Sequence, residues 1–371
     1  MKPKVIAYYL PQYHPFKEND EWWGKGFTEW TNVARALPLF RGHYQPKIPA
    51  DLGFYDLRLP IVREQQAQLA REAGVYGFCY WHYWFGNGRQ LMADIFDEVL
   101  ASGKPDFPFC LGWANHSWYA KNWNSNDTSK DRLLIEQTYP GEEDIRMHYE
   151  YVLKAFKDPR YIKQDDKPVF TVFAPHMLPK DYKLIELWNK WAKDDGFKDG
   201  IYFVASYTPK TMDELDGKQW IDKGFSAVIP VRLNKHNIGK KRNHLYQTFA
   251  WYLNRNVGQL AFQQKYEYAD VIPYLACKNR DCDETVIPTL VPNFDHSPRS
   301  GKNGYILNNS TPELFGRLCS NIFNNIKNKH NQLVWLRSWN EWGEGNYMEP
   351  DLVFGHGYLN TFKKALDSFN S

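Results

Sequence analysis

The feature that most constrains the fold is an alternation of apolar, strand-like runs with segments in which apolar residues recur at helical spacing. The strand-like runs lie at residues 5–10, 77–81, 109–113, 169–173, 201–205, 227–229, 286–290 and 333–336. The helical patterns lie at residues 58–73, 91–101, 144–156, 182–192, 212–221, 244–262, 312–326 and 357–369. Alternating strands and helices indicate a parallel α/β sheet, and eight such pairs predict a (β/α)₈ TIM barrel.

The connections between these segments support the barrel. Pro312 after Thr311 predicts a helix start, and Gly103 predicts a helix end. Helix-to-strand connections are short, whereas the long strand-to-helix connections cover residues 11–57, 114–143, 291–311 and 339–356. A TIM barrel carries its functional site on this second set. Because no linker or repeat interrupts the pattern, we expect a single domain over residues 1–371 with long βα loops.

The stretch from residue 333 to 350 carries the clearest chemical signal. Glu341 and Glu344 follow the last strand-like run, three residues apart, with Trp and Gly on either side. Two carboxyl groups beside flat aromatic rings are typical of enzymes that act on glycosidic bonds. The alternative is a solvated loop whose acids have no chemical role, and the density of Trp after a buried strand favours the site.

Polar and aromatic residues also follow the ends of other predicted strands. Because the carboxyl ends of barrel strands meet at one rim, we expect these groups to converge on a substrate. The candidate substrate-binding residues are Tyr13, His14, Glu29, Trp30, His82, Tyr83, Trp84, Asn115, His116, Trp118, Asp295, Arg299, Trp339, Asn340 and Trp342. Glu29 has the alternative role of a buried ion-pair partner, and Asp295 and Arg299 have the alternative of pairing with each other.

Composition favours sugar over nucleic acid as the partner. Aromatic residues make up 17% of the 371 residues, which provides stacking surface. The net charge is +3, with no basic stripe of the kind that binds nucleic acid. No apolar stretch reaches the roughly 18 residues of a membrane span, and the N-terminal apolar run is too short for a signal peptide. We therefore expect a cytoplasmic protein without an integral membrane segment.

The cysteine and histidine patterns predict neither a disulfide framework nor a bound metal. Cys79 and Cys110 lie in strand-like runs and resemble small buried apolar residues, whereas Cys277 and Cys282 could pair. The histidines form no HxH or HExxH pattern, so no metal and no cofactor is expected. A DxD-like triplet at residues 281–283 lies in a polar loop, away from a strand end.

Several motifs resemble those of the WbsX-like family, which is similar to the endo-α-1,2-mannosidases of glycoside hydrolase family 99. The matching stretches are YYLPQYH (8–14), WWGKGFTEWTNV (22–33), HYQPKIPADLGFYDLR (43–58), GFCYWHYWF (77–85), KPDFPFCLGWAN (104–115), KPVF (167–170), FDHSPR (294–299) and WNEWGEG (339–345). They cover nearly the whole chain. The resemblance implies a barrel, in agreement with the alternation, and an oligo- or polysaccharide substrate.

The resemblance also implies roles for the two acids. Glu341 resembles the base that deprotonates the 2-hydroxyl of the sugar, and Glu344 resembles the general acid/base, in a retaining α-mannosidase-like reaction. We then expect a raised pKa at Glu344 and an ionised Glu341. His116 stands where relatives often carry an acid, and FDHSPR replaces a more usual Trp-Asp-Asn pattern, so the sugar preference stays open.

Two other functions remain open from the sequence. WbsX-like chains are tied to biosynthesis loci for polysaccharide, O-antigen and lipopolysaccharide, which makes a WbsX-type glycosyltransferase the main alternative. Against it, the chain has no Gly-rich phosphate loop or Rossmann fingerprint. The other alternative is a non-catalytic sugar-binding barrel, which would require neither Glu341 nor Glu344.

Overall fold

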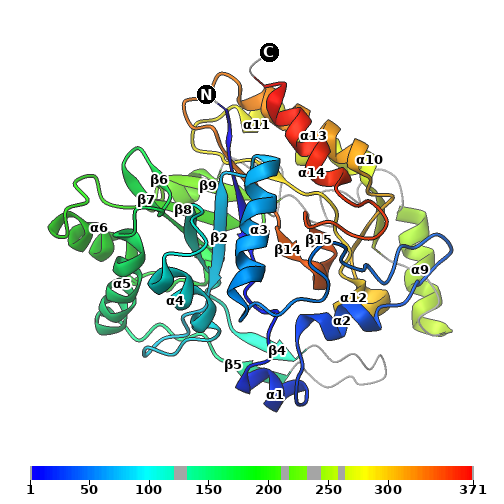
Figure 1. Ribbon diagram of the computed structural model, residues 1–371, viewed down its shortest axis with the longest axis horizontal. Helices are drawn as coiled ribbons and strands as arrows, with labels where there is room; N and C mark the ends of the chain where they lie inside the picture. The colour runs from blue at the N-terminus through cyan, green and yellow to red at the C-terminus, as the bar shows by residue number, and fades with distance from the viewer. Residues whose placement is uncertain (1, 121–131, 210–216, 232–243, 258–263, 370–371) are drawn as a thin grey trace.

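The computed structural model describes residues 2–120, 132–209, 217–231, 244–257 and 264–369, and at its centre lies a sheet of parallel strands (Figure 1). The central strands are β1 (Lys4–Tyr9), β2 (Gly77–His82), β3 (Phe109–Trp113), β7 (Lys167–Val172), β8 (Tyr202–Tyr207), β9 (Ala227–Pro230), β11 (Thr289–Leu290) and β13 (Leu333–Leu336). They follow the order β11-β13-β1-β2-β3-β7-β8-β9. These strands agree with the eight predicted runs, apart from shifts at their ends.

The two outermost strands in this order meet and close the barrel. Val228 of β9 bridges Val286, just before β11, in parallel register. The Val228 N–H donates to the Thr285 carbonyl at 2.8 Å, and the Ile287 N–H donates to the Val228 carbonyl at 2.8 Å. The seventh predicted strand, residues 286–290, is therefore joined to β9 by one bridge and to β13 only through β11. The prediction of a (β/α)₈ barrel is confirmed.

Helices surround the strands. The longer ones are α3 (Pro60–Ala73), α4 (Ala93–Ser102), α5 (Glu142–Phe156), α6 (Leu184–Asp194), α9 (His244–Asn256), α10 (Tyr268–Leu275), α13 (Pro312–Ile326) and α14 (Gly357–Asp367). The shorter ones are α1 (Lys17–Trp23), α2 (Glu29–Arg35), α7 (Lys218–Ile221), α11 (Lys278–Asp281) and α12 (Ser297–Ser300). Parts of two predicted helices, residues 212–216 and 258–262, lie outside the described residues.

Two predicted helix ends are confirmed by their caps. Thr311 accepts a hydrogen bond from the Leu314 N–H at 3.3 Å, so α13 begins at Pro312 with a side-chain cap. Gly103 follows α4 with a φ of 69°, a left-handed conformation that glycine adopts without strain.

The barrel interior is filled by side chains from alternate strand positions. Tyr8 stacks on Trp81 with ring centres 4.2 Å apart and contacts Trp335 at 5.9 Å. Gly112 leaves room for them, since a Cβ there would lie 3.0 Å from the Cys79 sulfur and 3.4 Å from the Trp81 ring. Tyr9, one position further along β1, points outward, and its hydroxyl donates to Gln66 of α3 at 2.6 Å.

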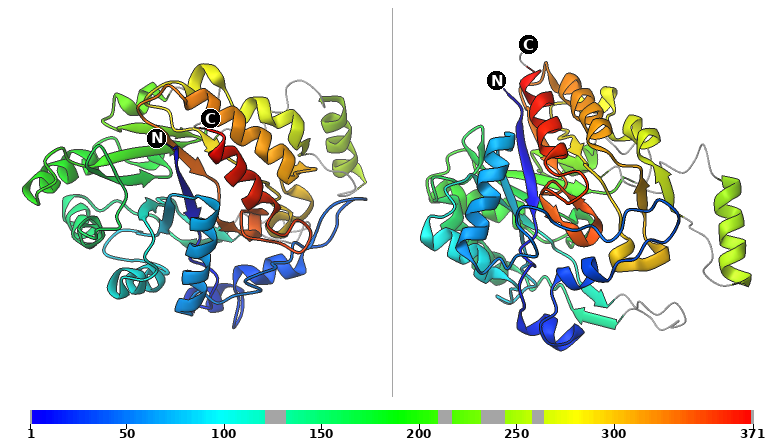
Figure 2. Two further views of the ribbon diagram at one scale, coloured as in Figure 1. Left: turned by 45° about the horizontal axis from the view of Figure 1, so that its top comes forward. Right: turned by 45° about the vertical axis from the view of Figure 1, so that its right-hand side comes forward.

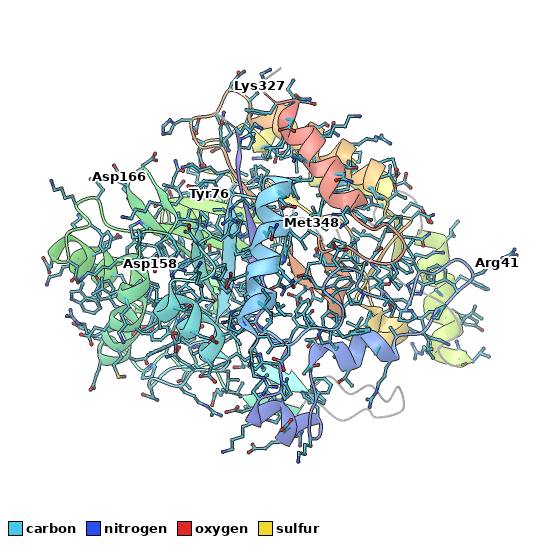
Figure 3. All side chains as sticks on the ribbon, in the orientation of Figure 1. Arg41, Tyr76, Asp158, Asp166, Lys327 and Met348 are labelled. Carbon is cyan, nitrogen blue, oxygen red and sulfur yellow. The ribbon has the colours of Figure 1, made fainter. Side chains whose placement is uncertain are left out.

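The long connections gather at one end of the barrel. Tyr76 and Asp166, which precede β2 and β7, lie in the upper part of Figure 3. In the same orientation, α1, α2, α12 and the hairpin of β4 (Trp118–Ala120) and β5 (Arg132–Ile135) lie in the lower part of Figure 1. The carboxyl ends of the strands therefore point to the end that carries the long βα loops, as predicted.

Other small strands complete the fold. They are β6 (Lys163–Gln164), β10 (Lys265–Glu267), β12 (Ile306–Asn308), β14 (Asn340–Glu341) and β15 (Asn346–Tyr347). The view in Figure 2 (right) shows α9 standing away from the body of the molecule. All five cysteines are free, so Cys277 and Cys282 do not pair. Among the described residues, no helix combines the length and apolar character needed to cross a lipid bilayer.

Candidate active site

An open cavity of about 510 Å³ lies at the loop-rich end of the barrel. One side, which we call the polar wall, consists of Glu29, Arg299, Glu341 and Glu344. Another side, which we call the aromatic wall, consists of Trp22, Trp23 and Phe27 from the first βα connection and Trp118 and Tyr119 from β4. The cavity therefore combines acids and flat rings, the two features expected from the sequence.

Arg299 holds the polar wall together. Its Nη1 donates to Glu344 at 2.7 Å, and its Nη2 donates to Glu341 at 2.9 Å. Its Nε donates to Glu29 at 3.0 Å. One guanidinium thus binds three carboxyl groups that come from the first and last βα connections, and the two motif acids lie side by side. Figure 1 shows α2, which carries Glu29, next to α12, which carries Arg299.

The environment of Glu341 matches a group that exchanges protons near neutral pH. Burial raises the pKa of Glu341 to about 7, the charge of Arg299 opposes this rise, and Glu344 and Glu29 add to it. Glu341, which was expected to be simply ionised, therefore carries a raised pKa, and the raised pKa expected at Glu344 stays a prediction. Glu344 also lies 3.6 Å from the Nε2 of His296.

The closing motif has glycine at positions 343 and 345 because neighbouring side chains approach its backbone too closely for a Cβ atom. A Cβ at Gly343 would collide with the Glu29 carboxylate and lie 2.9 Å from the Nε of Arg299. Gly345 has a φ of 53°, and a Cβ there would lie 2.9 Å from both the Lys47 amine and the Asp295 Cβ. Glycine at these positions lets the motif wrap around the Glu29–Arg299 pair.

Buried polar contacts from the first βα connection fix the backbone of the motif. The Tyr13 hydroxyl donates to the Asn340 carbonyl at 2.7 Å and accepts from the Trp342 N–H at 2.9 Å. The Asn340 side chain accepts from the Leu10 N–H at 2.7 Å and donates to the Leu10 carbonyl at 3.0 Å. Tyr13 and Asn340 therefore position Glu341, which lies between Asn340 and Trp342, without reaching the cavity.

Behind the motif, Glu349 forms a closed network of its own. It accepts from the Trp342 indole at 2.6 Å, from Gln66 at 2.6 Å and from the Tyr55 hydroxyl at 2.9 Å. Burial raises the pKa of Glu349 to about 7, against these hydrogen bonds. Trp342 also stacks on Tyr347 at 3.7 Å, so it belongs to the core and not to a sugar platform.

Asp295 and Arg299 do not pair with each other. Asp295 accepts from His43 at 2.7 Å and from Gln45 at 2.7 Å. His43 accepts the Leu39 N–H on its Nδ1 at 3.1 Å, which leaves its Nε2 to donate to Asp295. Hydrogen bonds from His43 and the nearby charge of Lys47 outweigh burial and lower the pKa of Asp295 to about 2. The sequence-based alternative of an Asp295–Arg299 pair is therefore wrong.

Three candidates that follow the second and third strands lie behind the cavity. His82 faces His148 with their Nε2 atoms 2.8 Å apart, and burial lowers the pKa of His82 to about 3. Trp84 donates to Asp144 at 3.1 Å. The Asn115 side chain accepts from the Ala174 N–H at 2.7 Å and so ties the end of β3 to the connection after β7. These three residues belong to the buried core, and each has the hydrogen-bond partner that a buried polar group needs.

The structure separates the candidate residues into two sets. Those that line the cavity are Glu29, Tyr83, His116, Trp118, Arg299, Glu341 and Glu344. Those buried behind its wall are Tyr13, His14, Trp30, His82, Trp84, Asn115, Asp295, Trp339, Asn340 and Trp342. In the second set, Trp30 donates to the Tyr55 carbonyl at 2.8 Å and Trp339 contacts Phe78 at 5.4 Å.

Other residues line the cavity besides the candidate catalytic and substrate-binding residues. They include Gln12, Trp22, Trp23, Phe27, Trp81, Tyr119, Phe173, His296, Arg337 and Ser338. The WWGKGF stretch carried a detectable signal, since two adjacent Trp residues in a polar segment indicate a surface for stacking. Trp81 and Arg337 carried none, because each lies within or next to an apolar strand run.

A family model described as Glycosyltransferase WbsX matches residues 5–362. The chain belongs to the WbsX family. Two proteins named "Uncharacterized protein WxcX" from Xanthomonas campestris pv. campestris, strains B100 and ATCC 33913, are 33% and 32% identical over 98% of this chain. The match covers 49% of each relative, so the chain spans about half the length of these curated relatives.

Solved structures share the fold of this WbsX chain. A GH99 endo-alpha-mannosidase from Bacteroides thetaiotaomicron superposes with a TM-score of 0.57 at 14% identity, over 99% of this chain and 97% of that one. A structure described as a glycoside hydrolase-like protein superposes with a TM-score of 0.58 at 16% identity, over 98% and 94% of the two chains. The two superpositions show that these proteins share the barrel fold of this chain.

Proposed function

We propose that the chain is a carbohydrate-active enzyme, a retaining endo-α-glycosidase that acts on a polysaccharide or O-antigen-type glycan. The observation that carries this proposal is the pair of motif carboxyls, Glu341 and Glu344, joined by Arg299 in an open cavity with an aromatic wall. Most glycosidases cleave the glycosidic bond with a pair of neighbouring carboxyl groups. The likeness of the barrel to a GH99 endo-alpha-mannosidase supports the same class.

The roles of the acids follow the order of proton transfers. Glu341 takes the proton of the sugar 2-hydroxyl, and the freed oxygen attacks the anomeric carbon to form a 1,2-anhydro sugar. Glu344 gives its proton to the leaving glycosidic oxygen, then removes a proton from water, which opens the ring while Glu341 returns its proton to O2. A base works best when its pKa lies near the working pH, and that of Glu341 is about 7.

Arg299 acts in these proton transfers as a positioning residue. Its charge offsets the mutual repulsion of Glu29, Glu341 and Glu344, which would otherwise separate the carboxyls. A hydrogen bond to each motif acid also sets the direction of their free oxygens. The aromatic wall lies open to solvent, with Trp23 36% exposed, which suits a chain-like substrate that extends beyond the cavity.

A glycosyltransferase is the second candidate, because the matching family is described as Glycosyltransferase WbsX. The DxD-like triplet does not support it. Asp281 ends α11, before β11, and is buried where it accepts from Asn325 at 2.9 Å. It therefore lies at the end of the barrel opposite to the cavity, and a nucleotide-sugar would have to bind the cavity itself.

The test is a paired assay of the wild type and Glu344→Gln on α-linked manno- and related oligosaccharides, with and without nucleotide-sugar donors. NMR reports the products and their anomeric configuration. We expect hydrolysis with retention, and a loss of about 10²–10⁴-fold in kcat in the variant. Glu64→Gln, an exposed acid on α3, is the matched control and should leave the rate unchanged. Turnover only with a donor sugar indicates the transferase, and binding that survives without any turnover indicates a sugar-binding barrel.

A further inference from the structure

Two arginines line the cavity, and they differ in how they are neutralised. Arg299 contacts three carboxylates, whereas Arg337 has no ion pair and no side-chain hydrogen bond among the described residues. Arg337 is half-buried and directly follows β13. A partly desolvated guanidinium without an acceptor is costly, so a folded protein keeps one where a ligand supplies the acceptor.

The alternation along β13 explains why Arg337 points into the barrel. Trp335 contacts Tyr8 inside the barrel, so Leu336 faces outward and Arg337 faces inward again, one layer nearer the cavity. The register pairs Ala7 with Leu336, which brings Arg337 beside Tyr8. Burial raises the pKa of the Tyr8 phenol, and the charge of Arg337 partly opposes that rise, as expected for neighbours.

Arg337 therefore lines the cavity at the end of β13, next to an aromatic surface. Tyr8 stacks on Trp81, which lines the cavity and meets the Phe173 ring edge-on at 5.2 Å. An aromatic ring can stack on a sugar, and a guanidinium beside that ring can bind a negative charge on the same sugar. Together they form a site for an acidic sugar.

The charge balance favours a carboxylate over a phosphate. The three acids of the polar wall all pair with Arg299, so Arg337 by itself offers one positive charge, which matches the single negative charge of a carboxylate. A nucleoside diphosphate brings two or more charges, and the lining formed by described residues contains no lysine and no glycine-rich cradle. A planar carboxylate also matches the planar fork of arginine with two parallel hydrogen bonds.

We propose that Arg337 recognises the carboxylate of a hexuronate unit, so that the substrate is an acidic glycan. This deepens the proposed function, because it names the substrate class of the same cavity. It does not depend on the catalytic roles of Glu341 and Glu344, since binding to Arg337 is measured without turnover.

The experiment uses hexuronate-containing oligosaccharides in matched pairs, with the carboxylate intact or reduced to the neutral hydroxymethyl group. Calorimetry measures their binding to the Glu344→Gln variant, which leaves Arg337 in place and stops any cleavage. We expect the acidic member of a pair to bind at least about tenfold more tightly. Adding Arg337→Gln should remove this preference and leave binding of the reduced member unchanged, whereas Arg41→Gln, an exposed site at the edge of Figure 3, should preserve it.

Specific results overturn the proposal. Equal binding of acidic and reduced oligosaccharides, no binding of any acidic oligosaccharide, or an equal loss for both members in Arg337→Gln would each do so. Tighter binding of uridine diphosphate or inorganic phosphate than of uronate would reassign the site to a phosphate group. If Arg337→Gln does not fold, the proposal is still tested by comparing the binding of the acidic and the reduced oligosaccharide to protein that retains Arg337. Acid-dependent binding without any hydrolysis would sustain this proposal while the glycosidase assignment fails.

Discussion

The polar wall and the aromatic wall face the same cavity but are held in different ways. Every acid of the polar wall lies within 3.0 Å of Arg299, and buried contacts from Tyr13 and Asn340 fix the backbone beneath it. The aromatic wall has ring contacts instead, such as Trp22 with Trp118 at 6.2 Å, and Tyr119 is 52% exposed. Groups that move protons need a fixed geometry, whereas groups that support a sugar tolerate adjustment.

The largest difference between the walls should appear when Arg299 is removed. Arg299→Leu leaves three neighbouring carboxyls without a counter-charge, and we expect a loss of about 3–5 kcal/mol in the free energy of unfolding. Urea denaturation at pH 7 measures it, with Arg41→Leu as the exposed control. Equal denaturation midpoints for the two variants would show that the polar wall does not depend on its central cation.

A smaller effect is expected from the glycine that the polar wall encloses. Gly343→Ala places a methyl group against the Glu29–Arg299 pair and should cost about 1–3 kcal/mol, together with a loss of kcat. The double variant Gly343→Ala with Glu29→Ala removes the obstacle. We therefore expect it to be less destabilised than the sum of the single variants, and strict additivity would contradict the contact.

The two buried carboxyls with a pKa of about 7 should give the protein a characteristic pH dependence. The ordinary pKa of a glutamate is 4.5, so between pH 4.5 and 7 the folded protein keeps protons that the unfolded chain has released. The free energy of unfolding should then fall as the pH rises through this window, by about 1 kcal/mol or more.

Variants separate the contributions of the two carboxyls. Denaturation midpoints between pH 4.5 and 8 should show a smaller slope in Glu341→Gln and in Glu349→Gln. Only Glu341 faces the cavity, so only its variant should also remove the acidic limb of the kcat/KM profile near pH 7. A wild-type midpoint that stays constant or rises between pH 4.5 and 7 would contradict the raised pKa values.

The smallest effect is expected on the aromatic wall. Trp23→Ala removes an exposed ring, and we expect a two- to tenfold rise in KM, from a stacking contribution of about 0.5–1.5 kcal/mol, with little change in kcat or stability. Tyr76→Ala is the matched control, since Tyr76 is 37% exposed at the other end of the barrel. A loss of kcat in Trp23→Ala that equals the loss in Gly343→Ala would remove the distinction between the walls.

Part of the site was predictable because periodicity is a local property. Apolar runs place the strand ends, and the parallel barrel brings strand ends together, so Glu341, Glu344, Arg299 and Glu29 were all expected at one rim. Which neighbour faces the cavity is decided by packing. His82 and Tyr83 are adjacent in the chain, yet His82 turns to His148 in the core and Tyr83 lines the cavity.

The amino-acid sequence by itself determined the eight-fold alternation, the family and the closing motif with its two acids, since each depends on short-range patterns. Only the tertiary structure decided that one guanidinium joins Glu29, Glu341 and Glu344, and that burial raises the pKa of Glu341. It also decided that Arg337 lines the cavity without a partner among the described residues. The physical reason is that charge pairing and desolvation depend on distances between residues up to about 300 positions apart in the chain, and only folding sets these distances.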